Sequence, residues 1–517
     1  MGRAVRPLVL GALAAILAGC TGAAATSPPA TRLAGHAPSS PPPSVSSAPS
    51  AVPATPSGTA LAWHACGNGL ECAALAVPLD YDHPDDTAIR IYLVRAPATD
   101  PAHRVGSLVL NYGGPGQSGV QAIMQAGLTG LLPAALRERF DLVSFDPRGV
   151  GLSSPLSCVD DATMDRLRAL DPEPTTAAGR QAILDGARVF AEGCEARSGP
   201  LLPYISTEAV ARDLDRIRAA LGEDRLTYLG YSYGTYLGAR YATLFPDRVR
   251  AMVLDAAVDL TMDPARWAEE QMAASEAALD RFLAACASEP ACQFRGDGDP
   301  ARAFDALLAR ARAIPIPAGG ARVLGLGDAL SGVQALLMWA AWDDLAAALG
   351  AAAAGDGSLL LAAADAAAGR SGSGQYDNSM AAAMATLCME TPDRPGTAAL
   401  ETLAARLVKV APHLGGVYET GCLSWPVRPE TTPPPLAAPA GTPLLVIGGT
   451  GDPTTPYAWS ERMAASLGNA VLVTRRGEGH TSEVDPGNAC LGEAMAAYLV
   501  DLTVPPGGLT CAPSPEG

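Results

Sequence analysis

A serine between two glycines is the feature of this sequence best suited to chemistry. Residues 230–234 read G-x-S-x-G around Ser232, directly after a short apolar run. In a nucleophile elbow, this pattern marks a sharp turn from a strand into a helix, with the serine in a strained conformation at its tip. Gly230 and Gly234 would avoid the Cβ clashes of a close strand–helix contact. We therefore expect Ser232 to be a nucleophile at a helix N-terminus, where free N–H groups favour developing negative charge.

A serine nucleophile needs a general base, and chain order narrows the choice to one histidine. In hydrolases with this elbow, an acid and then a histidine follow the serine. Of the six histidines, only His413 and His480 come after Ser232. His480 lies in a glycine-rich loop after the last expected strand, where its imidazole can swing over the serine. We predict that His480 is the base and that His413 belongs to the surface or to the helical region described below.

Asp452 is the predicted acid of a Ser-Asp-His triad, and Asp255 is its rival. Asp452 lies in a turn after the apolar run 444–447, and one helix and one strand separate it from His480. Asp255 follows the strand after the elbow, where some hydrolases carry their acid. The chain order favours Asp452. Its expected role is to fix the imidazole tautomer and stabilise the imidazolium without taking the proton itself.

A glycine-rich loop at residues 113–119 is the candidate for an oxyanion hole. It follows a buried apolar run, and its glycines allow backbone N–H groups to face a ligand. We expect the N–H of Tyr233 and one N–H from Gly113 or Gly114 to stabilise the tetrahedral oxygen, an effect worth several kcal/mol. Phosphate binding is disfavoured because no Gly-Lys-Ser or Gly-Lys-Thr follows the loop.

Strands that alternate with helices around the elbow predict a mostly parallel, doubly wound α/β sheet. Apolar runs end at the loops named above, and helical patterns such as residues 207–221 separate them. The expected strands are residues 89–94, 107–112, 140–145, 226–231, 249–254, 443–448 and 470–474.

Residues 261–435 break this alternation and predict a helical cap inserted into the core. They contain Ala-rich amphipathic stretches and no clear strand. The expected helices are residues 264–288, 300–313, 328–349, 380–389 and 397–410. The predicted organisation is therefore a first core part at 62–260, the cap, and a second core part at 436–517.

The composition and the N-terminus indicate an exported protein. The chain has 517 residues, is 48% hydrophobic and carries a formal charge of −17, which suits a large core and argues against nucleic acid as a partner. Residues 1–19 read as a signal peptide whose apolar stretch is too short to span a bilayer comfortably. The segment ends L-A-G-C, resembling a lipobox, so we expect a lipid on Cys20 that anchors the protein at the outer face of the cell membrane. The alternative is an ordinary signal peptide and a secreted protein. Residues 20–61, rich in Ala, Pro, Ser and Thr, should form a disordered tether.

The chain has eleven cysteines, so ten remain after Cys20, an even number that suits disulfides in an oxidising compartment. Their connectivity cannot be proved from sequence, but pairing neighbours gives Cys66–Cys72, Cys158–Cys194, Cys286–Cys292, Cys388–Cys422 and Cys490–Cys511. No metal site is expected, because no C-x-x-C run occurs and no second histidine beside His64 completes a ligand set.

As a set, these motifs resemble the secreted bacterial tripeptidyl aminopeptidase family, α/β-hydrolases with a TAP-like C-terminal segment. They are also similar to mycobacterial cell-envelope serine protease lipoproteins and, more distantly, to prolyl aminopeptidases. The matching positions are Trp63, Cys66, Cys72, 77–81, 113–116, 146–153, the elbow, 452–456, 479–480, Cys490 and Cys511. The sequence departs from the family pattern at Gln117, where a small residue is usual, and at Glu390, where Cys-x-Asp is common. These departures bear on substrate preference.

The resemblance implies an α/β-hydrolase fold and a serine peptidase that releases short peptides, expected to be tripeptides, from a free N-terminus through an acyl-enzyme. Recognition of an α-ammonium calls for buried cap acids, and Glu269, Glu270 and Glu390 are the candidates. Peptides or proteins would be the substrates, no cofactor is implied, and we expect a monomer. A carboxylesterase with the same triad and a cell-envelope endoprotease remain alternatives. A catalytically idle binding lipoprotein is disfavoured, because no triad member is missing.

Overall fold

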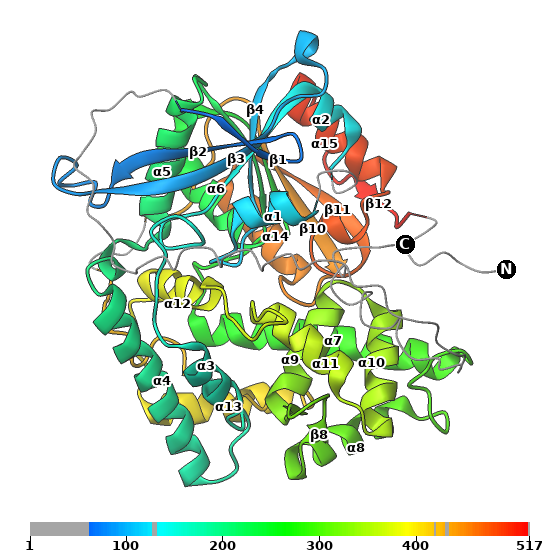
Figure 1. Ribbon diagram of the computed structural model, residues 1–517. Coiled ribbons are helices and arrows are strands. Elements are labelled where there is room, and N and C mark those ends of the chain that lie inside the picture. Colours follow the sequence, from blue (N-terminus) through cyan, green and yellow to red (C-terminus); the bar gives the residue numbers. More distant parts are fainter. Residues whose placement is uncertain (1–60, 127–131, 418–419, 430–433, 515–517) are drawn as a thin grey trace, which may run out of the picture. The chain divides into compact units, whose positions relative to one another are not determined.

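The computed structural model describes residues 61–126, 132–417, 420–429 and 434–514 (Figure 1). The predicted signal peptide, the lipidation of Cys20 and nearly all of the tether lie outside the described residues. Among the helices that the structure describes, none is both long enough and apolar enough to cross a membrane.

One mixed sheet forms the core of the protein. Its ten strands are β1 (His64–Gly67), β2 (Leu70–Pro78), β3 (Ala88–Ala96), β4 (Gly106–Asn111), β5 (Phe140–Phe145), β6 (Leu226–Tyr231), β7 (Val249–Asp255), β10 (Leu444–Gly451), β11 (Ala470–Glu478) and β12 (Thr510–Cys511). Their order is β1-β2-β3-β5-β4-β6-β7-β10-β11-β12. The strands from β5 to β12 run parallel, whereas β1, β2 and β3 pair antiparallel at one edge.

Helices cover both faces of this sheet. On one face lie α5 (Thr207–Ala220), α6 (Tyr233–Leu244) and α14 (Tyr457–Leu467), and on the other lie α1 (Gly119–Ala126), α2 (Ala134–Arg139) and α15 (Ala489–Asp501). Every residue of β4, β5 and β6 is buried as a result, which explains why these strands are mostly apolar. The predicted doubly wound α/β fold is confirmed.

Seven helices between β7 and β10 build the cap. They are α7 (Pro264–Ser288), α8 (Pro300–Ala313), α9 (Leu326–Met338), α10 (Trp342–Ala354), α11 (Ser358–Ala367), α12 (Ser379–Glu390) and α13 (Thr397–Val410), with a two-stranded ribbon, β8 (Ile316–Pro317) and β9 (Val323–Leu324). The cap has an apolar core of its own, which contains Phe282, Phe304 and Leu345. The expected helix 328–349 is in fact two helices. The chain turns at Ala340, whose φ is 52°, and the Ala341 N–H donates to the Leu336 carbonyl.

A second segment of the chain, between β5 and α5, packs against the cap. It contains α3 (Asp161–Arg168) and α4 (Ala177–Ser198), which lie near α12 and α13 in Figure 1. Arg168 binds Asp365 at 2.9 Å and Asp328 at 2.5 Å, so α3 is tied to two cap helices. This segment lies within residues 62–260, the range predicted for the first core part, and its helices were not predicted separately.

Five disulfides brace the described residues: Cys66–Cys72, Cys158–Cys194, Cys286–Cys292, Cys388–Cys422 and Cys490–Cys511. This is the pairing of sequence neighbours that the sequence analysis set out. The Cys388–Cys422 bridge joins α12 to the segment after α13, close to the site described next.

Candidate active site

Ser232 stands at the tip of the turn between β6 and α6. Its φ of 54° and ψ of −125° form a conformation that side-chain-bearing residues rarely adopt. A Cβ on Gly230 would lie 2.4 Å from the Gly234 carbonyl oxygen, and a Cβ on Gly234 would lie 2.7 Å from that of Asn111. Both glycines are therefore required by close packing. The turn has the backbone of a nucleophile elbow.

His480 and Asp452 contact each other directly at the carboxyl end of the sheet. Nδ1 of His480 lies 2.8 Å from Oδ2 of Asp452, and the two residues are 6% and 4% exposed. The other oxygen, Oδ1, accepts the backbone N–H groups of Thr454 at 2.8 Å and Thr455 at 2.9 Å. These bonds hold the carboxylate facing Nδ1, so the imidazole proton belongs there and Nε2 can act as an acceptor.

Two opposed effects act on the pKa of His480. Burial lowers it, because the imidazolium loses water, but the charge and hydrogen bond of Asp452 raise it. Asp255 and Glu483 add further negative charge, and the net result is a pKa above the usual histidine value. The arrangement therefore strengthens His480 as a base.

Thr455 is a member of the site that the sequence analysis missed. Its Oγ1 donates to Oδ2 of Asp452 at 2.9 Å and lies 3.3 Å from Nδ1 of His480. The hydroxyl thus braces the acid against the imidazole. The available signal was the repeated threonine in the turn that carries Asp452.

The loop at residues 113–119 lies against the elbow, as an oxyanion hole requires. A Cβ on Gly113 would lie 2.5 Å from the Tyr231 oxygen and 3.0 Å from the Tyr233 nitrogen. The Gly113 N–H donates to Oδ1 of Asn111 at 3.1 Å, whereas the Gly114 N–H has no acceptor among the described residues. Tyr233 is the first residue of α6, so its N–H has no partner within the helix. Because the Gly113 N–H already has an acceptor, the Gly114 N–H is the better candidate for the second donor.

The structure separates the two candidate acids. The carboxylate of Asp255 accepts the Ser482 N–H at 2.9 Å and makes no hydrogen bond to the His480 ring. Asp452 is the residue that faces Nδ1. Ser232 Oγ makes no hydrogen bond within the described residues, so this structure does not show it bonded to His480. Catalytic hydrogen bonds are often longer in unliganded enzymes.

Two of the three candidate cap acids already have cationic partners. Glu270 accepts from Arg266 at 2.8 Å, from Arg462 at 2.6 Å and from the Trp459 indole at 2.8 Å. Glu269 lies 2.8 Å from Arg406. These arginines neutralise both carboxylates, which disfavours either glutamate as the acceptor of a substrate ammonium.

Glu390 is the third candidate and differs from the others. It ends α12, and its oxygens accept the Thr207 N–H at 2.9 Å and the Tyr236 hydroxyl at 3.2 Å. No Lys, Arg or His of the described residues forms an ion pair with it. Tyr236 lies one helical turn after Ser232, and burial together with the Glu390 charge raises the pKa of Tyr236. An unneutralised carboxylate therefore lies beside the helix that carries the nucleophile.

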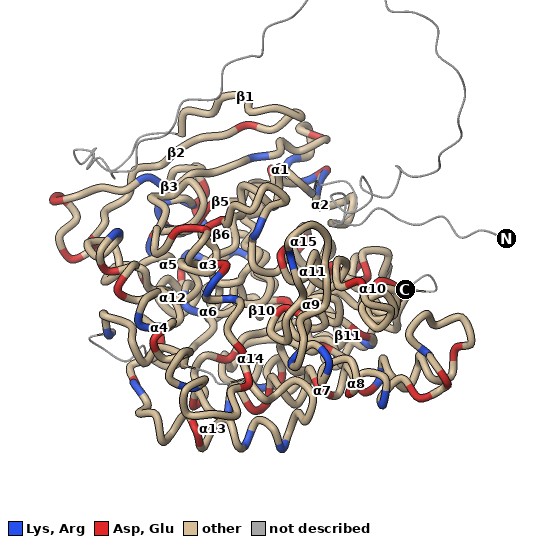
Figure 2. Tube along the Cα trace, turned by 60° about the horizontal axis from the view of Figure 1, so that its bottom comes forward, with Lys and Arg blue, Asp and Glu red and all other residues tan. Residues whose placement is uncertain are grey.

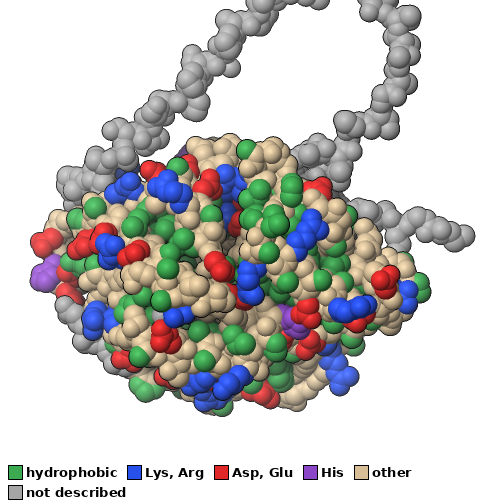
Figure 3. Space-filling model, turned by 90° about the horizontal axis from the view of Figure 1, so that it is seen from below, with side chains coloured by type: hydrophobic (Ala, Val, Ile, Leu, Met, Phe, Trp, Pro, Cys, Tyr) green, Lys and Arg blue, Asp and Glu red, His purple; other side chains and the backbone are tan. Residues whose placement is uncertain are grey.

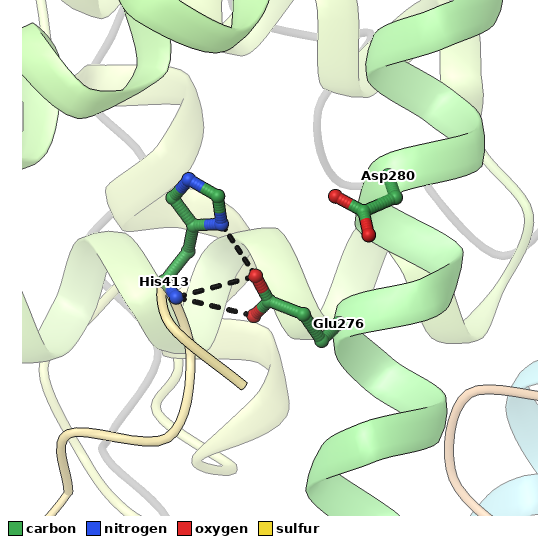
Figure 4. A group of neighbouring side chains, drawn as sticks. All are labelled: Glu276, Asp280 and His413. Carbon is green, nitrogen blue, oxygen red and sulfur yellow. Dashed lines mark hydrogen bonds and ion pairs between the residues drawn. The ribbon is translucent and has the colours of Figure 1, made fainter. Parts of the chain in front are cut away.

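One cluster of metal-ligating side chains occurs in the part of the chain that the structure describes, and it lies within the cap. Glu276, Asp280 and His413 have ligand atoms within 4.8 Å of one another (Figure 4). Glu276 accepts the N–H groups of His413 at 3.2 Å and Leu414 at 3.1 Å and also pairs with Nδ1 of His413. Nε2 of His413 faces Asp305 at 3.2 Å. Both ring nitrogens of His413 thus already have carboxylate partners. The cluster joins α7 to the turn after α13.

Charges of both signs are spread along the chain (Figure 2). Acidic residues outnumber basic ones by 53 to 36. In the face shown in Figure 3, basic, acidic and hydrophobic side chains are interspersed, without a broad basic patch. This pattern does not suit the phosphates of a nucleic acid.

Comparisons with known proteins place these observations in context. The model of the alpha/beta hydrolase fold family matches residues 106–483. Serine protease Hip1 of Mycobacterium tuberculosis is 37% identical over 462 residues, covering 86% of this chain and 87% of that protein. Carboxylesterase B of the same species is 37% identical over 454 residues, covering 86% of each chain. Tripeptidyl aminopeptidase of Streptomyces lividans is 33% identical over 456 residues, covering 86% of this chain and 84% of that protein.

Proposed function

The chain belongs to the α/β-hydrolase family and, within it, to the bacterial tripeptidyl aminopeptidase group of serine peptidases, and we propose that it releases tripeptides from free N-termini. The substrates would be peptides or proteins outside the cell membrane. The proposed triad is Ser232, His480 and Asp452. The observation that carries the N-terminal specificity is the unneutralised carboxylate of Glu390 beside α6.

The geometry supports acyl transfer in two half-reactions. Ser232 Oγ attacks the scissile carbonyl carbon while Nε2 of His480 takes its proton, and the oxyanion accepts from Tyr233 and Gly114 N–H groups. The imidazolium then protonates the leaving amine, the C–N bond breaks, and an acyl-enzyme remains. Water attacks that ester with His480 again as base, releasing the short peptide and restoring Ser232. Asp452 keeps the imidazole in the required tautomer throughout.

Glu390 suits an α-ammonium because its own hydrogen bonds leave its charge uncompensated. The Thr207 N–H and the Tyr236 hydroxyl are neutral donors that orient the carboxylate. A charge-assisted hydrogen bond from a substrate ammonium would compensate the charge of Glu390. Because the Cys388–Cys422 bridge fixes the end of α12, such a contact would limit how many residues fit before the scissile bond.

The first prediction concerns this amine site. The wild type should cleave a free tripeptide anilide much faster than its N-acetylated counterpart. Glu390→Gln should lower kcat/KM on the free peptide by about ten- to a hundred-fold, because one charge-assisted contact is worth roughly 1.5–3 kcal/mol. Glutamine keeps acceptor capacity for Thr207, so hydrolysis of a small p-nitrophenyl ester should hardly change. Steady-state kinetics on the three substrates measure this.

Glu270→Gln is the matched control, since that glutamate is already paired with two arginines. It should leave the ratio of free to acetylated cleavage unchanged. If the wild type cleaves acetylated and free anilides equally well, there is no amine site and the aminopeptidase proposal fails. Ester hydrolysis without anilide cleavage would favour the carboxylesterase alternative, which one relative's name also supports.

We further propose that the protein is a lipoprotein held at the outer membrane face through Cys20. Cys20→Ser removes the thiol that the lipid would modify, and the ten cysteines of the five disulfides are untouched. The second prediction is that this variant leaves the membrane pellet for the soluble fraction and keeps its specific activity. Fractionation followed by a salt wash measures the shift. A variant that still pelleted after the wash would show that another segment holds the protein.

A further inference from the structure

Asp255 is hydrogen-bonded to the loop that carries Ser232 and to the loop that carries His480. Its backbone carbonyl accepts the Ser232 N–H at 2.9 Å. Its carboxylate oxygen Oδ2 accepts the Ser482 N–H, also at 2.9 Å, two residues after His480. Asp255 is the last residue of β7 and is 1% exposed, so it offers both acceptors from a rigid strand end.

Both of these loops have strained backbones where Asp255 holds them. Ser232 has a φ of 54°, and Thr481, between His480 and Ser482, has a φ of 65°. Residues with side chains keep such conformations only where their surroundings fix them. The bond to Ser232 acts on the strained residue itself, and the bond to Ser482 acts directly beside Thr481. The acceptor for Ser232 is a backbone carbonyl that any residue at position 255 supplies, so a substitution of Asp255 removes only the acceptor for Ser482 and lets the loop beside Thr481 relax.

We propose that Asp255 is a positioning residue that sets the placement of Ser232 relative to His480 by accepting one backbone N–H from each loop. The inference rests on the proposed triad, but not on recognition of an N-terminal amine. Asp255 does not touch the reacting atoms. It acts through the backbone of the residues that do, and the geometry of attack is sensitive to displacements of about 1 Å.

The charge of Asp255 also affects the pH dependence of activity, which gives the proposal a second measurable consequence. The ionisable groups that raise the pKa of His480 are Asp452 just after β10, Asp255 at the end of β7 and Glu483 in the loop that carries His480. The positive charge of Arg475 in β11 acts on Asp255 and lowers its pKa. Asp255 raises the pKa of His480, and burial together with Asp255 raises the pKa of Glu483 to about 7. His480 must be neutral to act as base, so activity is lost as the pH falls through its pKa. Burial raises the pKa of Asp255 as well, so its carboxylate acts on His480 only where it is ionised. Removing that charge lowers the pKa of His480 and moves the acidic limb to lower pH, and the shift is smaller where Glu483, relieved of the Asp255 charge, ionises in its place.

The third prediction compares two substitutions. Asp255→Ala removes the acceptor for Ser482 and should lower kcat by about ten- to a hundred-fold with little change in KM, because misplacement affects the chemical step. Asp255→Asn keeps a carbonyl oxygen and removes the charge. It should lose less kcat and shift the acidic limb of kcat/KM to lower pH. Full pH profiles on a p-nitrophenyl ester and on a free tripeptide anilide measure both effects.

Asp259→Asn is the matched control. Asp259 is a buried carboxylate four residues further along, bonded to Thr261 and Arg462 and to neither catalytic loop. Its kcat and pH profile should match the wild type. The proposal would be overturned if the Asp255 and Asp259 variants lost equal kcat, if that loss followed the fall in melting temperature, and if neither pH profile shifted. A loss for Asp255→Asn as large as that for Asp452→Asn would also overturn it and would make Asp255 the triad acid.

The ester measurement separates this test from the proposed specificity. If the wild type does not distinguish free from acetylated peptides, the aminopeptidase proposal fails while the ester profiles still decide the role of Asp255. If Asp255→Ala does not fold, the kcat of Asp255→Asn compared with that of Asp259→Asn decides it.

Discussion

Ser232→Ala is expected to lose nearly all turnover, roughly a 10⁶-fold fall in kcat, while the protein stays folded. The alanine has no Oγ to attack the carbonyl, so no acyl-enzyme forms. Stability should be unaffected for two reasons. Alanine keeps the Cβ, so the strain at φ 54° is unchanged, and Ser232 Oγ has no hydrogen-bond partner among the described residues to be orphaned.

Two measurements are needed for this variant. Ester and anilide hydrolysis give the loss of turnover, and labelling by a fluorophosphonate probe reports the nucleophile directly. Ser371→Ala, at an exposed cap serine, is the matched control and should be labelled like the wild type. Labelling of Ser232→Ala at the wild-type rate would place the nucleophile on another residue.

The sheet was the most predictable part of the fold, for a physical reason. Parallel strands covered on both faces are mostly apolar, so β5 was predicted with the bounds that the structure shows, and β6 was recognised as the apolar run before the elbow. The three-stranded antiparallel edge was not predicted as a unit. Its strand β2 alternates buried and exposed residues and contains three alanines, which carry little pattern.

The cap shows where sequence patterns stop being informative. Residues 328–349 are Ala-rich and contain no proline, so nothing marks the break between α9 and α10. The break depends on Ala340 in a left-handed conformation that glycine usually supplies. Likewise, no helices were predicted at residues 161–198, which form α3 and α4 and fell within the range 62–260 assigned to the first core part.

Within the site, chain order was enough to single out Asp452 and His480, which the structure brings into contact. It could not tell which cap glutamates keep an uncompensated charge. Arg266 is only four residues from Glu270, but the other partners, Arg406 of Glu269 and Arg462 of Glu270, lie more than a hundred residues away in the sequence. The double role of Asp255 was hidden for the same reason, because both of its donors are backbone groups of distant loops.

Asp452→Asn should lower kcat by about 10⁴-fold without a comparable loss of stability. The asparagine side-chain oxygen would take the place of Oδ1 and still accept from Thr454 and Thr455. Its amide group would then face His480 Nδ1, where Oδ2 of Asp452 lies at 2.8 Å. An N–H donor there selects the tautomer with its proton on Nε2, the nitrogen that must accept the Ser232 proton. The imidazolium also loses its neighbouring negative charge.

Kinetics and thermal melting together decide this prediction. Asp255→Asn is the informative comparison, because it removes another carboxylate charge near His480 without touching the ring. If Asp452 is the triad acid, Asp452→Asn lowers kcat by orders of magnitude more than Asp255→Asn does, while both variants stay folded. The reverse ranking would move the acid to the end of β7, and His480 would then have to turn away from the carboxylate and from Thr455, which lies 3.3 Å from Nδ1. The rank order of these two conservative substitutions therefore fixes which strand end supplies the acid.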